Sequence, residues 1–197
     1  MTGLSLITAP AIEPLTLQEA KAHLRVTASD DDSLILALIT AVRQSLEGRF
    51  GELQRALITQ TWDWFLDCFP ASSARPLDVP MPPLQSVTSI TYTDTDGASQ
   101  TWSAAKYTVD ARSLIGRVMP AYNETYPETR DVMNAVTVRF VAGFGATAAD
   151  VPAPIRHAML LQIAHLYDNR DTHMIGGSVE QLPAVRNLLA PYWIATF

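Results

Sequence analysis

The feature that most constrains the fold is a hydrophobic period that changes twice along the chain. Residues 34–46 and 155–166 carry apolar side chains at helical spacing, whereas the residues between them alternate apolar and polar in short runs. The first pattern is typical of amphipathic helices and the second of half-buried strands. Neither helical end makes a convincing core alone, so we expect the two ends to pack together around an inserted strand region.

The N-terminal part is predicted to form two helices. Thr16-Leu-Gln-Glu19 has the form of a capping box, in which Thr and Glu satisfy each other's backbone amides, and it predicts a helix over residues 16–26. Ser29–Asp32 begins a second helix, because carboxylates there favour the positive end of the helix dipole. Gly48 or Gly51 would end it.

The middle of the chain is predicted to be an antiparallel sheet. Ile58–Cys68 alternates like a half-buried strand. Asp94–Gly97 has the composition of a turn, and it would join Val87–Thr93 to a return strand at Gln100–Trp102. Further strands are expected at Tyr107–Asp110, Gly116–Met119 and Ala135–Ala142.

Helices return near the C-terminus. Pro152 and Pro154 suit the first turn of a long helix, and Pro183 opens a last short one. The segment between them is predicted to be a mobile loop because it contains a Gly-Gly pair. Its central residues are His173, Met174, Ile175, Gly176 and Gly177.

These elements predict an α+β fold with a small helical body made by the N- and C-terminal helices and an inserted antiparallel sheet or sandwich. We assign residues 1–54 and 150–197 to the helical body and residues 55–149 to the β-rich insertion. A chain of 197 residues can bury a core of its own.

Composition excludes several classes of function. The formal net charge of −6 argues against an electrostatic grip on nucleic acid as the main role. A single cysteine, Cys68, excludes an internal disulfide framework and a multi-cysteine metal site. Charged residues make up 17% of the chain, against about 25% in typical domains, so we expect part of the surface to be covered by something other than water. We expect neither a secretion signal nor a membrane span.

Candidate metal ligands do not converge. His157 and His165 lie two helical turns apart, which is about 12 Å, and His165 with Asp168 supplies only two ligands. The turn Asp94–Gly97 fails the EF-hand calcium pattern, because the positions that should be acidic are Tyr92 and Ser103. We therefore predict no metal site.

Catalytic signatures are also missing. The sequence has no nucleophile elbow, P-loop or dinucleotide-binding glycine motif. Cys68 is expected on the apolar face of its strand, where a free cysteine behaves as a small hydrophobe. We predict no catalytic residue and no cofactor, and hence no enzyme.

Two groups of aromatic residues remain open to interpretation. Trp62, Trp64 and Trp102 form either a ligand platform or ordinary sheet core. The apolar tail Trp193–Phe197 packs either on a partner or on its own subunit.

In motif order and spacing, nearly the whole chain resembles the long version of the head–tail connector, or adaptor, proteins of tailed phages, prophages and gene transfer agents. The resemblance is carried at the start by Pro14–Arg25 and Asp31–Ile35, in the middle by Gln60–Trp62 and Pro83–Val87, and at the end by Val151–Ile155, Leu166–Arg170 and Leu188–Tyr192.

The resemblance implies a structural adaptor in the neck of a particle, present in the bacterial cytoplasm during assembly. In that family a ring of subunits, usually dodecameric, docks beneath the portal protein and seats a tail-side connector or tail terminator. DNA passes through the lumen without sequence-specific contact, and the C-terminal segment engages the portal. In this chain the portal-contacting residues would be Trp193, Ile194 and Phe197.

Two other functions compete with the adaptor. One is a β-sandwich ligand-binding module that uses the tryptophans as its platform. The other is a small hydrolase that uses Asp and His side chains, for which the sequence contains no motif.

Overall fold

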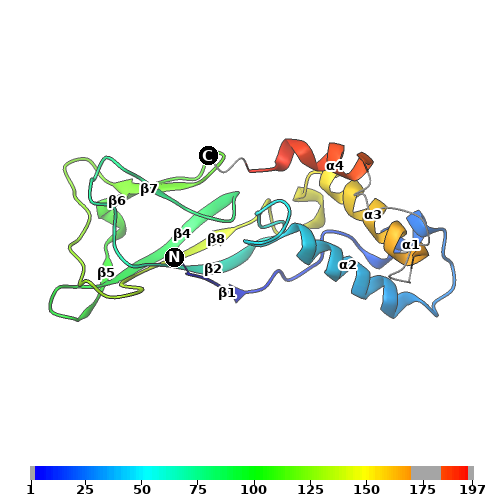
Figure 1. Cartoon of the computed structure of the whole chain (residues 1–197), viewed down its shortest axis with the longest axis horizontal. Coiled ribbons are helices and arrows are strands. Elements are labelled where there is room, and N and C mark those ends of the chain that lie inside the picture. Colours follow the sequence, from blue (N-terminus) through cyan, green and yellow to red (C-terminus); the bar gives the residue numbers. More distant parts are fainter. Residues whose placement is uncertain (1–2, 170–182, 195–197) are drawn as a thin grey trace, which may run out of the picture. The chain divides into compact units, whose positions relative to one another are not determined.

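The computed structural model describes residues 3–169 and 183–194, which divide into two compact units (Figure 1). The sheet unit comprises residues up to 11 and residues 59–144; the helical unit comprises residues 12–58 and the described residues from 145 onward. Helices and antiparallel sheets confirm the α+β class. In the described part of the chain, no helix is long and apolar enough to cross a membrane.

The helical unit is built from both ends of the chain. Its helices are α1 (Leu17–Leu24), α2 (Asp32–Leu46), α3 (Ala153–Asp168) and α4 (Pro183–Leu189). α3 packs against the other three helices. The largest fully buried side chains on these helices are Ile35, Ile39 and Leu46 of α2, Ile155, Met159 and Ile163 of α3, and Leu189 of α4. The apolar stripes read from the sequence therefore form one shared core.

The predicted start of α1 is confirmed, whereas α2 begins differently. The Glu19 amide donates to the Thr16 hydroxyl at 3.2 Å, and the Glu19 carboxylate accepts from the Thr16 amide at 2.8 Å. At α2, Asp31 occupies the N-cap position but makes no side-chain capping bond. Its carboxylate accepts instead from the hydroxyl of Tyr167 on α3, at 2.5 Å. The acidic start of α2 therefore joins two helices.

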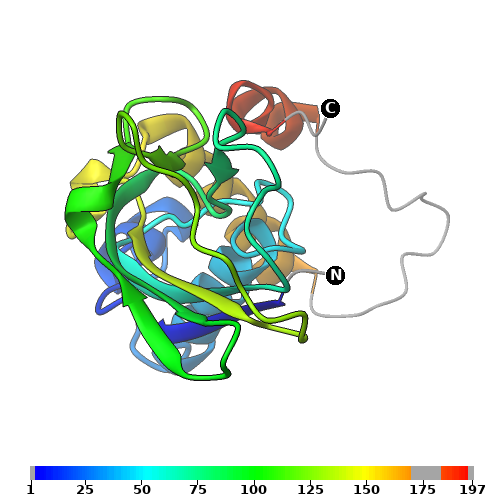
Figure 2. The same ribbon diagram turned by 90° about the vertical axis from the view of Figure 1, so that its left-hand side faces the viewer.

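The larger sheet has five antiparallel strands. In spatial order they are β1 (Gly3–Thr8), β2 (Gln60–Leu66), β8 (Val136–Ala142), β4 (Leu84–Thr93) and β5 (Ser99–Trp102). The central strand β8 buries Val136, Val138 and Phe140 completely. On the opposite face of the sheet, Arg139 of β8 forms two hydrogen bonds, at 2.8 and 2.7 Å, with the carboxylate of its cross-strand partner Asp63. The sheet is strongly curved (Figure 2).

A smaller sheet packs on the larger one through aromatic side chains. Its strands, in spatial order, are β3 (Leu77–Asp78), β7 (Arg117–Pro120) and β6 (Tyr107–Asp110). The Phe69 ring lies 5.4 Å from that of Trp102 and 5.3 Å from that of Tyr126, and Trp102 lies 4.9 Å from Tyr107, all between ring centroids. Offset and edge contacts of this kind favour a fixed arrangement of rings.

Strand β1 and Cys68 differ from the sequence analysis. Residues 3–8 were placed in the helical body, but Gly3–Thr8 pair with β2, with Leu4 opposite Trp64. So short an apolar run carries no periodicity strong enough to identify a strand, and its partner lies some 60 residues further on. Cys68 was expected on an apolar strand face, but β2 ends at Leu66 and Cys68 is exposed.

Tyr126 supplies a test of the sheet unit. Its hydroxyl donates to the Arg75 carbonyl at 2.8 Å, and burial raises its pKa to about 12. The neutral phenol therefore stabilises the folded state fully below pH ~10, and this contribution is lost as the pH rises toward 12. We predict that Tyr126→Phe lowers the free energy of unfolding by about 1 kcal/mol at neutral pH and flattens its decline at alkaline pH, as measured by urea unfolding.

Tyr122→Phe is the matched control, because the Tyr122 side chain is 94% exposed. This control should keep the wild-type decline of stability between neutral and alkaline pH. A Tyr126→Phe profile parallel to that of the wild type would contradict the assignment.

Candidate functional site

The segment predicted to contact a partner leaves the helical unit directly after α4. Buried Val185 and Leu189 hold α4 in the core, and a 3₁₀ turn, η3 (Ala190–Tyr192), follows. Trp193 and Ile194 are half-buried, and the Arg186 guanidinium lies 5.7 Å from the centroid of the Trp193 ring. Trp193 thus packs partly on α4, and both residues keep surface that is open to another molecule.

The remaining residues of the predicted site lie outside the described part of the chain. They are Phe197 of the tail and the loop residues His173, Met174, Ile175, Gly176 and Gly177.

Arg55 anchors the exit of the tail. Its side chain is only 4% exposed, and its Nε donates to the Tyr192 carbonyl oxygen at 2.7 Å. Burial lowers the pKa of the Arg55 guanidinium from its ordinary value. A hydrogen bond from a cation is stronger than a neutral one, and carbonyls that end a helical segment attract positive charge. Arg55 therefore fixes where Trp193 emerges.

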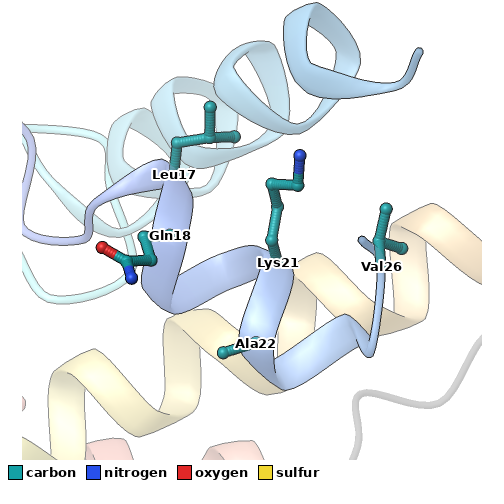
Figure 3. A pocket seen from close by; sticks show the side chains of 5 residues that line it. All are labelled: Leu17, Gln18, Lys21, Ala22 and Val26. Atoms are coloured by element: carbon teal, nitrogen blue, oxygen red, sulfur yellow. The ribbon is translucent and has the colours of Figure 1, made fainter. Parts of the chain in front are cut away.

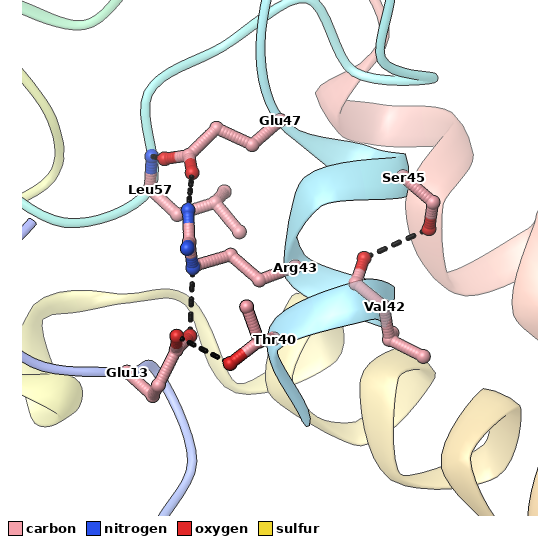
Figure 4. A network of polar contacts seen from close by, with 7 residues as sticks. All are labelled: Glu13, Thr40, Val42, Arg43, Ser45, Glu47 and Leu57. Carbon is pink, nitrogen blue, oxygen red and sulfur yellow. Dashed lines mark hydrogen bonds and ion pairs between the residues drawn. The ribbon is translucent and has the colours of Figure 1, made fainter. Parts of the chain in front are cut away.

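A network of charged groups holds the segment that carries Arg55 (Figure 4). Arg43 of α2 donates to Glu13 at 2.7 Å and also contacts the carboxylate of Glu47, which caps the end of the same helix. The second oxygen of Glu47 accepts from the Leu57 amide at 2.8 Å, and Thr40 donates to Glu13 at 2.9 Å. The network thus joins both ends of the 47–57 segment to α2.

Charge balance explains why this network tolerates burial. The Glu47 side chain is 6% exposed and that of Arg43 is 11% exposed. Desolvation alone would lower the pKa of Arg43, but its hydrogen bonds and charge interactions with Glu13 and Glu47 outweigh that effect and raise the pKa. A buried ion pair of this kind is costly to break, because removing one partner leaves an uncompensated charge.

The segment also presents an aromatic side chain to solvent. Phe50 is 97% exposed, and the Arg49 guanidinium lies 5.9 Å from its ring centroid. Backbone bonds from Glu52 to Ser45 at 3.0 Å and from Leu53 to Leu46 at 2.9 Å tie the loop back to α2. A Cβ at Gly51 would overlap the Glu47 carbonyl, so only glycine fits there.

Sequence reasoning missed Glu47, Phe50 and Arg55. Gly48 and Gly51 were interpreted only as the end of a helix, although they build the loop that carries Phe50. One signal for Arg55 was available: it is a charged residue within the run Leu53–Ile58, whose apolar members are all buried. A charge in such a run needs a partner.

Other candidate residues do not assemble into a chemical site. Among the described residues, no group of three or more potential metal ligands lies together. His157 packs edge-on against His23 with ring centroids 6.2 Å apart, and the His165 ring contacts Asn169. Trp64 and Trp102 are buried and Trp62 is half-buried, so the three tryptophans do not form an exposed platform.

One family model matches the chain, and several solved structures share its fold. Residues 14–114, just over half of the chain, match the family model described as phage gp6-like head-tail connector protein. No curated protein matches the chain.

Among solved structures, a chain from the neck of an empty GTA particle computed with C6 symmetry is 22% identical, with a TM-score of 0.79, covering 99% of this chain and 97% of that one. A chain from the virion of a native gene transfer agent (GTA) particle is 22% identical, with a TM-score of 0.78 and coverage of 98% and 96%. One from the neck of a native GTA particle computed with C12 symmetry is 21% identical, with a TM-score of 0.70 and coverage of 99% and 97%. These likenesses show a shared fold.

The bond from Arg55 to the Tyr192 carbonyl leads us to predict that Arg55→Met lowers the stability of the protein and also loosens the segment around Trp193. Methionine retains much of the apolar stem but leaves the Tyr192 carbonyl without its charged donor, so we expect the free energy of unfolding to fall by about 2 kcal/mol. Amide exchange in the peptide that contains Trp193 should also become faster.

Chemical denaturation and hydrogen-exchange mass spectrometry measure the two effects. Arg112→Met removes an exposed arginine of the sheet unit and should change stability by less than about 0.5 kcal/mol. If Arg55→Met behaved like this control in both measurements, Arg55 would not be the anchor.

Proposed function

Because the chain belongs to the phage gp6-like head–tail connector family, we propose that it is a structural adaptor in the neck of a tailed phage-like particle, in which copies form a ring between the portal and the tail. The observation that carries this proposal is the family match over residues 14–114, which spans α1, α2 and the 47–58 segment. The shared fold with chains of gene transfer agent necks, over 99% of this chain, supports it.

The portal is the proposed partner of the C-terminal tail. Trp193 and Ile194 emerge from a point fixed by Arg55, and both keep exposed apolar surface. Phe197 belongs to the proposed contact as the last apolar residue of the tail. Large aromatic side chains dominate the energy of protein interfaces, and repetition around a ring multiplies their effect.

The charge of the chain suits a conduit for DNA. Each copy carries a formal charge of −6, so a ring of copies has no general attraction for phosphates. In the proposed particle, DNA therefore slides through the lumen without sequence-specific contact. The tail side of the ring seats a connector or tail terminator protein.

The proposed role is structural and not catalytic. The competing ligand-binding module would need an exposed platform of tryptophans, but Trp64 and Trp102 are buried and Trp62 is half-buried. The competing hydrolase would need a catalytic Asp and His in contact, and no hydrogen bond between these residue types occurs within residues 3–169 and 183–194.

Truncation of the tail tests the proposal. We predict that a chain ending at Tyr192 is folded, since the core of the helical unit ends at Leu189. When it replaces the wild-type protein in a particle-producing cell, electron microscopy should show packaged heads without tails or heads that have lost DNA. The matched control is Val132→Ala with Met133→Ala, which removes exposed apolar side chains from the sheet unit.

The control should give normal tailed particles. If the truncated chain also gave normal tailed particles containing the adaptor, the tail would not be the portal contact. Particles whose necks lacked this protein altogether would overturn the adaptor role itself.

A further inference from the structure

We propose that Phe50 of one copy enters a groove beside α1 of a second copy, and that this contact joins neighbouring subunits of the ring. The inference rests on the proposed adaptor function and adds to it the surfaces through which copies meet.

Phe50 has the properties of an interface anchor. It is a large aromatic side chain that is 97% exposed, which removes any role in its own core. Backbone bonds from Glu52 to Ser45 and from Leu53 to Leu46 hold the loop, so the backbone that carries Phe50 is fixed. A fixed loop backbone reduces the conformational entropy that is lost on binding.

The groove is an apolar hollow along one side of α1 (Figure 3). It is open to solvent, has a volume of about 510 Å³ and is lined by Leu17, Gln18, Lys21, Ala22 and Val26. The Lys21 ammonium is paired with Asp32 at 2.5 Å, so its hydrocarbon stem forms part of the wall while its charge is neutralised. The volume is sufficient for a phenyl ring, and the chemistry of the wall suits one.

The groove cannot receive Phe50 of its own chain. Phe50 lies beyond the C-terminal end of α2, whereas Asp32, at the edge of the groove, is the first residue of that helix. A helix of 15 residues is about 22 Å long, and Figure 1 shows the 47–58 segment and α1 at opposite ends of α2. The loop of one copy would therefore bind the groove of the next copy. Such a contact between two different surfaces is head-to-tail, and head-to-tail contacts are the type from which closed rings are built.

Charges beside the two surfaces are complementary. Exposed Arg49 precedes Phe50 in the loop, while Asp32, which pairs with Lys21 of the groove wall, follows exposed Asp30 by two residues in the chain. Opposite charges at the rim of a contact speed and orient association, and salt screens them. The occupant best suited to this groove is therefore a second copy of the loop that carries Arg49 and Phe50.

Cross-linking in assembled particles tests the contact directly. In a Cys68→Ser background that keeps Phe50, Arg49→Cys and Ala22→Cys are placed in the same chain, and particles are treated with a short bis-maleimide. If Phe50 occupies the groove of its neighbour, denaturing gels should show a ladder of covalent oligomers. A chain carrying Arg49→Cys with Leu114→Cys, a residue that is 65% exposed on the sheet unit, should give no ladder.

Phe50→Ala measures the contribution of the side chain. We expect the concentration of the variant that gives half-maximal incorporation into particles to rise about 30-fold. Thermal unfolding should be unchanged, because Phe50 is not part of the core of its own copy. Tyr122→Ala, which removes a side chain that is 94% exposed, is the matched control and should incorporate normally.

The outcomes separate this inference from the function on which it rests. If particles of the double-cysteine chain contained the ring but gave no ladder, or if Phe50→Ala incorporated normally, the contact would be overturned and the adaptor role would remain intact. Wild-type particles in which the protein forms no ring would overturn the adaptor role, and the contact with it.

Discussion

Both proposed contact surfaces depend on one interaction, the buried contact of Glu47 with Arg43 and Leu57. A carboxylate with so little exposure is stable only when a cation and a hydrogen-bond donor satisfy it, and Glu47 has both. Because Glu47 is the C-cap residue of α2, its contacts also fix the segment 47–58 that follows the helix. That segment carries Phe50 outward and Arg55 inward, so one polar cluster positions both the surface proposed to meet a neighbouring copy and the residue that holds the proposed portal contact.

Interactions between residues close in the sequence made the helices and most strands predictable. The capping box at Thr16 needs only residues three apart, and the Asp94–Gly97 turn needs only its own backbone and the Asp94 carboxylate. The helical stripes and the alternation in β8 were readable for the same reason, since each element buries one face and its period shows which one. The helices and most of the strands followed from such signals.

Long-range pairings escaped prediction because no local pattern encodes them. The bond from Arg55 to Tyr192 joins residues 137 positions apart, and β1 becomes a strand only through its pairing with β2. Aspartate is a residue type that commonly caps helices, yet the Asp31 carboxylate accepts a hydrogen bond from the hydroxyl of Tyr167 on another helix. Within the candidate site, the apolar tail was visible as composition, whereas the buried arginine that fixes Trp193 required the fold.

The proposed contacts also have a natural order of assembly. Free copies each carry a charge of −6 and repel one another, so a single aromatic in a shallow groove gives weak association in solution. Copies held side by side on a portal by their tails meet at a high effective concentration, at which a weak contact becomes sufficient. On this view the anchored tail recruits each subunit, and Phe50 closes the ring only after its neighbours are in place. A contact that is weak between free copies would also keep rings from closing away from the particle.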